Sequence, residues 1–267
     1  TQPSIGREVA VKVIRKELAN ERGFIKRFEA EAQLVARLQH PRIVPLYDFW
    51  READNAYLVM PWLEGGSVAK RLRAGPLSLE ETVRVVRHVA AGLEFAHGRG
   101  VIHRDVKPSN VILDNSGKPW ITDFGLARID SDATLTVSGD LLGTVRYMSP
   151  EQALAKRIVV DHRTDIYSLG VTLYELLTLQ PVFSGQDRQE LLRQIAFEEP
   201  RSPQRLNKAI PAELETIVLK AMAKNPAERY DTAGDLAEDL KRFLEDRPIR
   251  ARRPTLVQLA AKWSRRH

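Results

Sequence analysis

The first sixty residues combine an alternating pattern with a helical one. Valines occupy every second position from Val9 to Val13, and this alternation predicts a β-strand. Apolar residues then recur at helical spacing from Phe24 to Leu38, with Pro41 just beyond them, which predicts a helix. Two short strands are predicted next. The predicted elements are a strand at 8–14, a helix at 24–39, and strands at 43–49 and 56–60.

The rest of the chain has a mainly helical pattern, interrupted by one strand pair that turns at 115–117. We therefore predict an α+β fold with two lobes. Residues 1–60 form a small β-rich lobe, residues 67–246 form a large helical lobe, and 61–66 connect them. The predicted elements of the large lobe are helices at 79–99, 164–178, 188–197, 212–224 and 232–244 and strands at 111–113 and 120–122.

Composition narrows the class of protein. The 267 residues include 43% hydrophobic and 28% charged residues and no cysteine. This excludes collagen, disulfide scaffolds, disordered tails and cysteine-based zinc sites. No run approaches the ~18 apolar residues of a membrane-spanning helix. Residues 1–6 lack a signal-peptide pattern and an initiating methionine, so we expect a cytoplasmic chain with an internal start.

The net charge of +6 originates at the end of the chain. Residues 247–267 hold seven lysines and arginines and no acid, whereas the rest holds 34 basic and 35 acidic residues. A near-neutral body does not resemble a nucleic-acid-binding domain, so nucleic acid is not an expected partner. The basic tail, 247–267, is either solvated or packed on the large lobe, or it is an amphipathic helix that contacts an anionic membrane surface. The apolar face of that helix would be Leu256, Leu259, Ala260 and Trp263.

Polar residues flank the predicted strand pair of the large lobe. Asn110 precedes the first strand and Asp123 follows the second. Because an antiparallel hairpin brings its ends together, these side chains should face each other and present oxygens suited to Mg²⁺. Asp105 lies in the same loop as Asn110, where a carboxylate can orient an attacking hydroxyl and accept its proton. The pattern favours metal-dependent phosphoryl transfer.

These segments resemble the protein kinase family, in particular the serine/threonine kinases of the bacterial receptor-like type. The resemblance covers most of the chain, and the motifs occur in the family's order. It implies a two-lobed protein-kinase-like fold and phosphoryl transfer from Mg²⁺-bound ATP to serine or threonine hydroxyls of protein substrates. The matching positions are 9–12, Glu31, 103–105, Lys107, Asn110, 123–125, Gly143, Thr144, 149–151, Asp165 and Arg229.

The resemblance implies a role for each residue of the catalytic centre. Asp105 is expected to orient the accepting hydroxyl, and Lys107 to contact the transferred phosphate, as in the serine/threonine class. Lys12 is expected to hold the α and β phosphates. Glu31 lies on the apolar stripe of its helix, and an inward carboxylate needs a partner, so we expect an ion pair between Glu31 and Lys12. The expected metal ligands are Asn110 and Asp123.

The resemblance also implies where the nucleotide binds. Adenine is expected to lie between Ala10 and Ile112, with Met60 behind it. Backbone groups of Pro61 and Leu63 are the expected hydrogen-bond partners of the base. Pro61 has no N–H, but its carbonyl can still accept a hydrogen bond.

The same resemblance implies residues that regulate the catalytic centre and residues that hold its structure. Arg104 is expected to receive a phosphate carried by the loop that follows Asp123, and we predict autophosphorylation of Thr136 or Ser138 in this loop. Glu151 and Arg229 resemble the family's buried ion pair. Asp165 resembles the residue that braces the catalytic loop from below.

One family feature is missing from the sequence. The family covers the phosphates with a Gly-x-Gly-x-x-Gly loop upstream of the lysine strand, but 11 residues precede Lys12 and Gly6 is their single glycine. Each lost backbone N–H donor to a phosphate would weaken nucleotide binding by ~1.5–3 kcal/mol. The strand at 8–14 would also become a sheet edge open to self-association.

Two functional hypotheses follow. The first is an ATP-dependent serine/threonine protein kinase, favoured by the intact set of Lys12, Asp105, Asn110 and Asp123. The second is a catalytically impaired kinase-fold fragment or a pseudokinase-like regulatory and binding module, favoured by the missing glycine loop. In a longer parent protein, either would be cytoplasmic or attached to the membrane beyond the basic tail.

Overall fold

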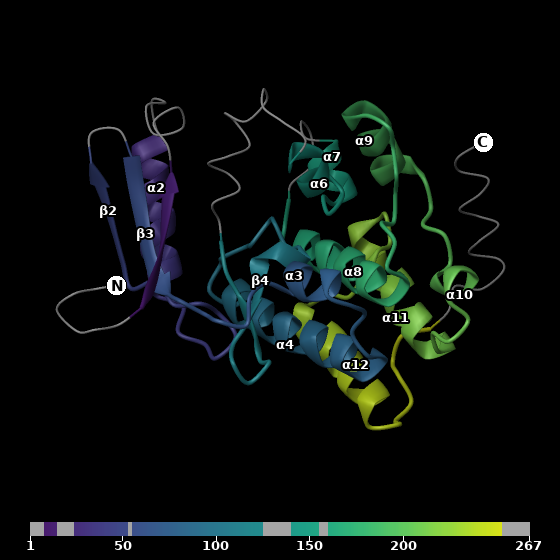
Figure 1. The fold of residues 1–267 in the computed structure, drawn as a ribbon. Coiled ribbons are helices and arrows are strands. Elements are labelled where there is room, and N and C mark those ends of the chain that lie inside the picture. Colours follow the sequence, from purple (N-terminus) through teal and green to yellow (C-terminus); the bar gives the residue numbers. More distant parts are fainter. Residues whose placement is uncertain (1–7, 15–23, 53–54, 125–139, 155–159, 253–267) are drawn as a thin grey trace.

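The chain folds into two lobes of unequal size, which lie side by side in Figure 1. The computed structural model describes residues 8–14, 24–52, 55–124, 140–154 and 160–252. The small lobe is a three-stranded sheet with one helix, and the large lobe is helical with a two-stranded hairpin on the side of the small lobe. This is the α+β architecture that the sequence pattern predicts.

The sheet of the small lobe is antiparallel, with strand order β1-β3-β2. Helix α2 covers one of its faces, where Phe28 and Ala32 pack against Ile14, Ala56 and Leu58. The elements of this lobe are β1 (Val9–Ile14), α2 (Phe24–Ala36), β2 (Asp48–Glu52) and β3 (Asn55–Pro61).

The alternation in β1 identifies the strand correctly, but its valines face away from the core. Val11 and Val13 are 49% and 48% exposed, whereas Ile14 is buried. Lys12 shares the inner face with Ile14 because side chains two residues apart lie on the same side of a strand. Packing against α2 therefore decided which face of β1 turns inward, and this orientation places the lysine beside the boundary between the lobes.

Strand β2 begins five residues later than the predicted strand at 43–49. The stretch before it joins the large lobe instead: the Val44 N–H donates to the Ile121 carbonyl, and the Ile121 N–H donates to the Arg42 carbonyl, both at 2.8 Å. Pro45 follows and has no N–H to continue a ladder. The apolar stretch at 43–44 thus pairs with a distant strand, which its sequence pattern does not reveal.

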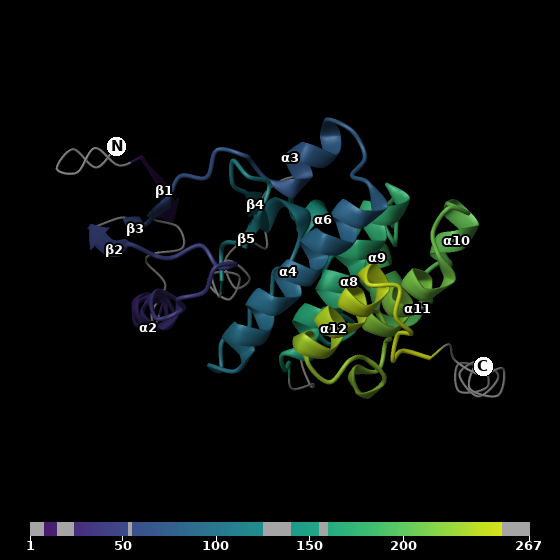
Figure 2. The same cartoon turned by 90° about the horizontal axis from the view of Figure 1, so that it is seen from below.

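Helix α8 forms the centre of the large lobe. It is buried along nearly its whole length, and helices α4 and α11 pack beside it. Helix α12 lies along α4, as Figure 2 shows. Helix α4 begins with a capping box, in which Ser78 and Glu81 satisfy each other's backbone N–H groups. These helices are α4 (Leu79–His97), α8 (Arg163–Thr178), α11 (Ala212–Ala221) and α12 (Ala233–Leu244).

The remaining elements of the large lobe are short. The hairpin strands and α9 lie within one residue of their predicted bounds, and these elements are β4 (Val111–Leu113), β5 (Pro119–Ile121) and α9 (Arg188–Phe197). Four helices were not predicted, because four to six residues are too few to display helical periodicity. They are α3 (Val68–Arg73), α6 (Asp140–Val145), α7 (Pro150–Ala153) and α10 (Pro203–Leu206). Two single-turn helices lie at Pro108–Asn110 and Pro226–Glu228.

The packed lobe continues to Ala251, past the predicted boundary at 246. The buried Asp239 carboxylate of α12 accepts the backbone N–H groups of Arg250, at 2.7 Å, and Ala251, at 2.9 Å. Ala251 is itself part of the main core. Residues 253–267, with the predicted amphipathic face, lie outside the described residues. Within the described ranges, no helix is long and apolar enough to cross a membrane.

Candidate active site

The hairpin of β4 and β5 places Asn110 and Asp123 at its two open ends. Val111 pairs with Ile121, and one step further the Thr122 N–H donates to the Asn110 carbonyl at 3.0 Å. Asn110 is buried, whereas the Asp123 side chain is 23% exposed. Asp123 has a φ of 66°, a left-handed conformation that is uncommon for a residue other than glycine. The hairpin thereby holds both side chains close to the boundary between the lobes.

Asp105 is fixed by two neighbours in the same loop. The Asn110 amide Nδ2 donates to the Asp105 carbonyl and to its carboxylate Oδ2, both at 2.9 Å. Lys107 Nζ lies 2.8 Å from the same Oδ2 and 3.0 Å from the Thr144 hydroxyl. Among the described residues, none donates a hydrogen bond to Asp105 Oδ1. The carboxylate is therefore held through one oxygen, and the other remains available to a substrate hydroxyl.

The backbone of this loop rests on Asp165 of α8, whose side chain is fully buried. Its carboxylate accepts the N–H groups of His103, at 2.8 Å, and Arg104, at 2.7 Å, and a hydrogen bond from His97 Nε2 at 2.7 Å. Burial alone would raise the pKa of Asp165, but the hydrogen bond and charge of His97, together with those of His103, keep the pKa below its ordinary value. Asp165 thus stays ionised and braces the catalytic loop, as the family resemblance implied.

Lys12 forms an ion pair that the sequence did not predict. Its Nζ lies 3.0 Å from Asp123 Oδ1. Lys12 lies on the inner face of β1, and its long side chain reaches Asp123 at the end of β5, whereas the expected pair with Glu31 stays a prediction. Glu31 lies on α2, one residue before the buried Ala32. The Lys12–Asp123 pair joins the two lobes directly.

The residues expected around the nucleotide lie on both sides of the boundary. Ala10 and Met60 are register partners on β1 and β3, and Ile112 on β4 bridges to Ser67 just after the connection. Pro61 ends β3, and Leu63 follows within the connecting segment 61–66. The connecting segment therefore follows directly on the strand that carries Met60 and ends beside the strand that carries Ile112.

The donor set around the hairpin suits a hard cation such as Mg²⁺. Asn110 binds Asp105 through its amide nitrogen, so its oxygen Oδ1 faces away from that contact and keeps acceptor capacity. Asp123 contributes a carboxylate at the other end of the hairpin. In the described part of the chain, no cluster of three or more histidine, aspartate and glutamate side chains forms a metal site. An amide oxygen and one carboxylate are the kind of incomplete set that Mg²⁺ accepts when phosphate oxygens and water complete its shell.

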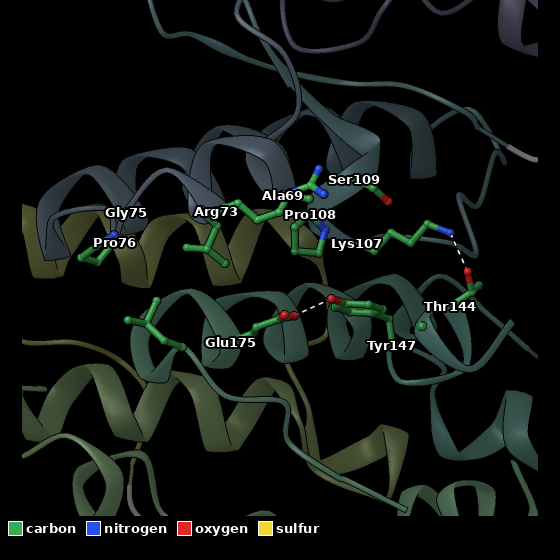
Figure 3. Close-up of a pocket in the computed structure, with 13 residues that line it drawn as sticks. Ala69, Arg73, Gly75, Pro76, Lys107, Pro108, Ser109, Thr144, Tyr147 and Glu175 are labelled. Carbon is green, nitrogen blue, oxygen red and sulfur yellow. Dashed lines mark hydrogen bonds between the residues drawn. The ribbon is translucent and has the colours of Figure 1, made fainter. Parts of the chain in front are cut away.

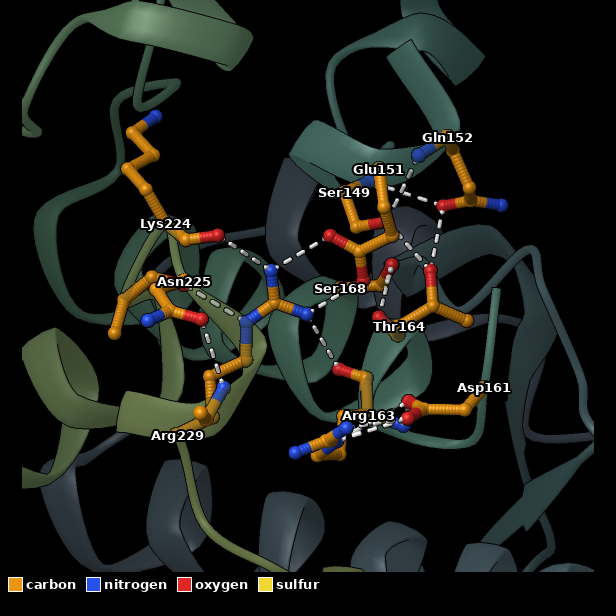
Figure 4. Close-up of polar contacts among 12 residues, drawn as sticks. Ser149, Glu151, Gln152, Asp161, Arg163, Thr164, Ser168, Lys224, Asn225 and Arg229 are labelled. Atoms are coloured by element: carbon orange, nitrogen blue, oxygen red, sulfur yellow. Dashed lines mark hydrogen bonds and ion pairs between the residues drawn. The ribbon is translucent and has the colours of Figure 1, made fainter. Parts of the chain in front are cut away.

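The ion pair between Glu151 and Arg229 is present and buried, as the resemblance implied. The two guanidinium nitrogens donate to the two carboxylate oxygens at 2.6 and 2.7 Å. Arg229 also donates to the carbonyls of Ala223, Arg163 and Lys224, so all its donor nitrogens are used. Figure 4 shows this pair between α7 and the loop before α12. It anchors the segment that follows the catalytic loop to the body of the large lobe.

Some predicted site residues lie outside the described ranges, and some contacts were not predicted. Thr136 and Ser138 belong to 125–139, which the structure does not describe. The sequence pattern indicates neither the contact of Gln152, which donates to the Arg104 carbonyl at 3.0 Å, nor the hydrogen bond from Tyr147 to Glu175. A glutamine inside a short unpredicted helix carries no sequence signal of its own for such a contact.

Residues 1–240 match the family described as the protein kinase domain, and the chain belongs to this family. Serine/threonine-protein kinase PrkC of Bacillus subtilis is 38% identical over 256 residues, which cover 95% of this chain and 39% of PrkC. Serine/threonine-protein kinase PknB of Mycobacterium tuberculosis is 39% identical over 252 residues, which cover 92% of this chain and 40% of PknB.

A solved structure supports the fold independently. The kinase domain of PknI from Mycobacterium tuberculosis superimposes with a TM-score of 0.71 at 25% identity, covering 90% of this chain and 88% of that domain. The chain spans about two fifths of the length of PrkC and PknB. The similarity to these bacterial serine/threonine kinases therefore concerns the protein kinase domain.

Proposed function

We propose that this chain transfers the γ-phosphoryl group of ATP to serine and threonine hydroxyls of proteins. The observation that supports this most directly is the way Asp105 is held. Asn110 and Lys107 bind its Oδ2, while Oδ1 takes no hydrogen bond from the described residues. A hydroxyl that donates to Oδ1 would be oriented for attack, and Asp105 would accept its proton as the phosphate bond forms.

Lys107 contributes positive charge at the same point. Its ammonium group lies between Asp105 and Thr144, and both contacts fix its position. A cation held there offsets the charge that spreads over the transferred phosphoryl group. Thr144 also couples this lysine to the chain segment 140–154, which borders the expected substrate.

Nucleotide and metal would be held at the boundary between the lobes. Asn110 and Asp123 would hold Mg²⁺, whose charge offsets that of the phosphates when the nucleotide is bound. Lys12 lies beside Asp123 and would exchange part of that ion pair for contacts with the phosphates. Ala10, Met60, Pro61, Leu63 and Ile112 would form the surroundings of the adenine.

A cavity beside Lys107 suits the protein segment that carries the accepting hydroxyl. Its volume is about 640 Å³, and it lies between α3 and α8 with Lys107 and Thr144 at one end, as Figure 3 shows. Leu72 and Pro76 contribute apolar surface, and Glu175 contributes a carboxylate that accepts a hydrogen bond from Tyr147. A peptide in this cavity would present its hydroxyl towards the Lys107 end and therefore towards Asp105.

Intact-mass measurement tests the proposed function. The purified chain is incubated with Mg²⁺ and ATP, together with a generic protein substrate, beside Asp105→Asn as the control. We expect added phosphate with the original chain and a loss of about 10²–10⁴-fold with Asp105→Asn, since a positioned base contributes about that much. Equal binding of an ATP analogue by both proteins shows that the control still folds. Mapping the added phosphates tests the prediction that Thr136 or Ser138 is modified.

An inactive chain that still binds the nucleotide would contradict the proposed transfer and favour the binding module. A folded chain that neither transfers phosphate nor binds the nucleotide would also contradict the proposed transfer and would favour the catalytically impaired kinase-fold fragment.

A further inference from the structure

Arg104 of the catalytic loop has an unfavourable backbone conformation. Its φ of 67° lies in the left-handed region, which costs free energy for a residue with a side chain. Asp105 follows directly, so the orientation of the peptide between the two residues determines where the Asp105 carboxylate points. Contacts that fix the backbone of Arg104 therefore act on the catalytic carboxylate.

The backbone of Arg104 is held from two sides. Its N–H donates to Asp165 Oδ1 at 2.7 Å, and its carbonyl accepts a hydrogen bond from Gln152 Nε2 at 3.0 Å. Asp165 belongs to the central helix α8, whereas Gln152 belongs to the short helix α7. The second contact thus joins the catalytic loop to the end of the segment that borders the substrate cavity.

A local network determines which way the Gln152 amide faces. Its oxygen Oε1 accepts the backbone N–H of Ser149 and the hydroxyl of Thr164, both at 3.0 Å. The hydroxyls of Ser149 and Thr164 lie 2.6 Å apart, and Figure 4 shows these groups together at the start of α7. A backbone N–H can only donate, so the oxygen must face Ser149 and the nitrogen must face Arg104.

We propose that Gln152 is a positioning residue that holds Asp105 in place through the Arg104 carbonyl. This inference rests on the proposed phosphoryl transfer and assigns to it a residue outside the catalytic loop. The same segment also reaches the loop through Thr144, which binds Lys107. A displacement of α7 would therefore disturb the base and the neighbouring cation together.

Two substitutions separate the hydrogen bond to Arg104 from the other contacts of Gln152. Gln152→Leu removes every side-chain hydrogen bond, whereas Gln152→Glu keeps an oxygen towards Ser149 and Thr164 but cannot donate to Arg104 while it is ionised. We expect kcat to fall by about ten-fold in both variants at pH 8, because a small displacement of a reacting group lowers the reaction rate strongly. The KM for ATP should change less than about two-fold, since the nucleotide residues are untouched.

The pH dependence adds a signature that a merely structural role would not produce. A protonated glutamic acid can donate to the Arg104 carbonyl, so the kcat of Gln152→Glu relative to the original chain should begin to recover as the pH falls from 8 to about 5, towards the ordinary glutamate pKa of about 4.3. The relative kcat of Gln152→Leu should stay low over the same range. Thr232→Ala is the matched control, because it removes the N-cap of α12 and lowers stability without a contact to Arg104.

Hydrogen exchange at the Asp105 amide, which shares its peptide group with the Arg104 carbonyl and donates to His103 Nδ1, gives a readout that does not depend on activity. We expect faster exchange in Gln152→Leu than in the original chain and no change in Thr232→Ala. Unchanged exchange in Gln152→Leu would overturn the proposal, as would a loss of kcat that Thr232→Ala reproduces. If the original chain transfers no phosphate, the proposed function fails, and faster exchange in Gln152→Leu would still support the positioning contact.

Discussion

Single residues of the large lobe carry charges that its core could not hold unpaired. The Glu151 and Arg229 side chains are 3% and 0% exposed, and together they make two direct hydrogen bonds. Arg229 satisfies its remaining donors on three carbonyls. Burying ions is costly, so this pair is better understood as a fixed connection between α7 and the C-terminal helices than as a large net gain in stability.

Removing one partner of the Glu151–Arg229 pair should therefore lower the stability of the protein strongly. We expect Glu151→Ala to lower the free energy of unfolding by about 3–5 kcal/mol, because Arg229 would stay buried without its counter-ion. Urea unfolding measures this loss. Glu190→Ala is the control, since its pair with Arg193 is exposed and should contribute less than about 1 kcal/mol. A loss for Glu151→Ala as small as that of the control would contradict the prediction.

His88 on α4 should make the protein sensitive to acid. Burial and the nearby charges of Arg42, Arg87 and Arg84 lower the pKa of His88 to about 4. The unfolded chain binds a proton near pH 6.5 and the folded chain near 4, so this residue contributes stability above pH 6.5 that is lost as the pH falls towards 4. His88→Gln should flatten the dependence of stability on pH between 6.5 and 4. Parallel curves for both proteins in thermal unfolding would refute this role.

Helices of the large lobe pack so closely that one added methyl group at their contact would force a helix to shift. Helices α8 and α11 meet at Gly170, where an added Cβ would lie 2.9 Å from the Ala221 Cβ and 2.9 Å from the Met222 Cγ. Such a distance is too short for carbon atoms in contact, so one of the helices would have to shift. Glycine inside α8 is therefore a packing requirement, although it lowers helix propensity.

The substitution Gly170→Ala tests this packing. Helix propensity alone predicts a gain of up to ~1 kcal/mol, whereas overpacking predicts a loss of about 1–3 kcal/mol. We expect a net decrease in the free energy of unfolding, because neither Ala221 nor the backbone behind it can move aside as a flexible side chain can. Urea unfolding of Gly170→Ala, and of the same variant with Ala221→Gly to relieve the contact, measures the effect. Increased stability in the single variant would show that α8 and α11 have room to adjust.

At the scale of the whole molecule, the main core and the core of the small lobe differ greatly in size. Among the described residues, five buried hydrophobic side chains form the core of the small lobe, against 34 in the main core of the large lobe. Buried apolar area sets most of the stability of a folded unit. The lobes meet through the Lys12–Asp123 ion pair, the connecting segment 61–66 and the backbone hydrogen bonds of 42–44 to Ile121. The core of the small-lobe sheet is separate from the main core, so the two need not unfold together.

We predict that the small lobe opens before the large lobe. The free energy of opening measured by amide hydrogen exchange should be lower in β1 and β3 than in α8. A smaller cooperative core needs less free energy to open. Native-state exchange in low denaturant measures both. Phe28→Ala removes a buried ring from the small core and should speed exchange there alone. Equal protection of both lobes would show that they unfold as one unit.

Features that depend on residues close together in the sequence were predictable, whereas contacts between residues far apart in the sequence were not. Long helices such as α4 and α9 were predictable, because an amphipathic period repeats over several turns. Asn110 and Asp123 were placed together by a local hairpin of 13 residues from 111 to 123, which the sequence displays. The partner of Lys12 and the role of Gln152 were not predictable, because each depends on a contact across many residues with no periodic signal.

The sequence by itself determined the α+β character, the large helical lobe and the loop that carries Asp105, Lys107 and Asn110. It also contained the motifs in the order of the protein kinase family. Only the tertiary structure decided that β1 turns Lys12 and not its valines inward, that Lys12 pairs with Asp123, and that Gln152 reaches Arg104. The reason is that periodicity and motif spacing report local geometry, whereas a side chain's partner depends on which distant surfaces pack together.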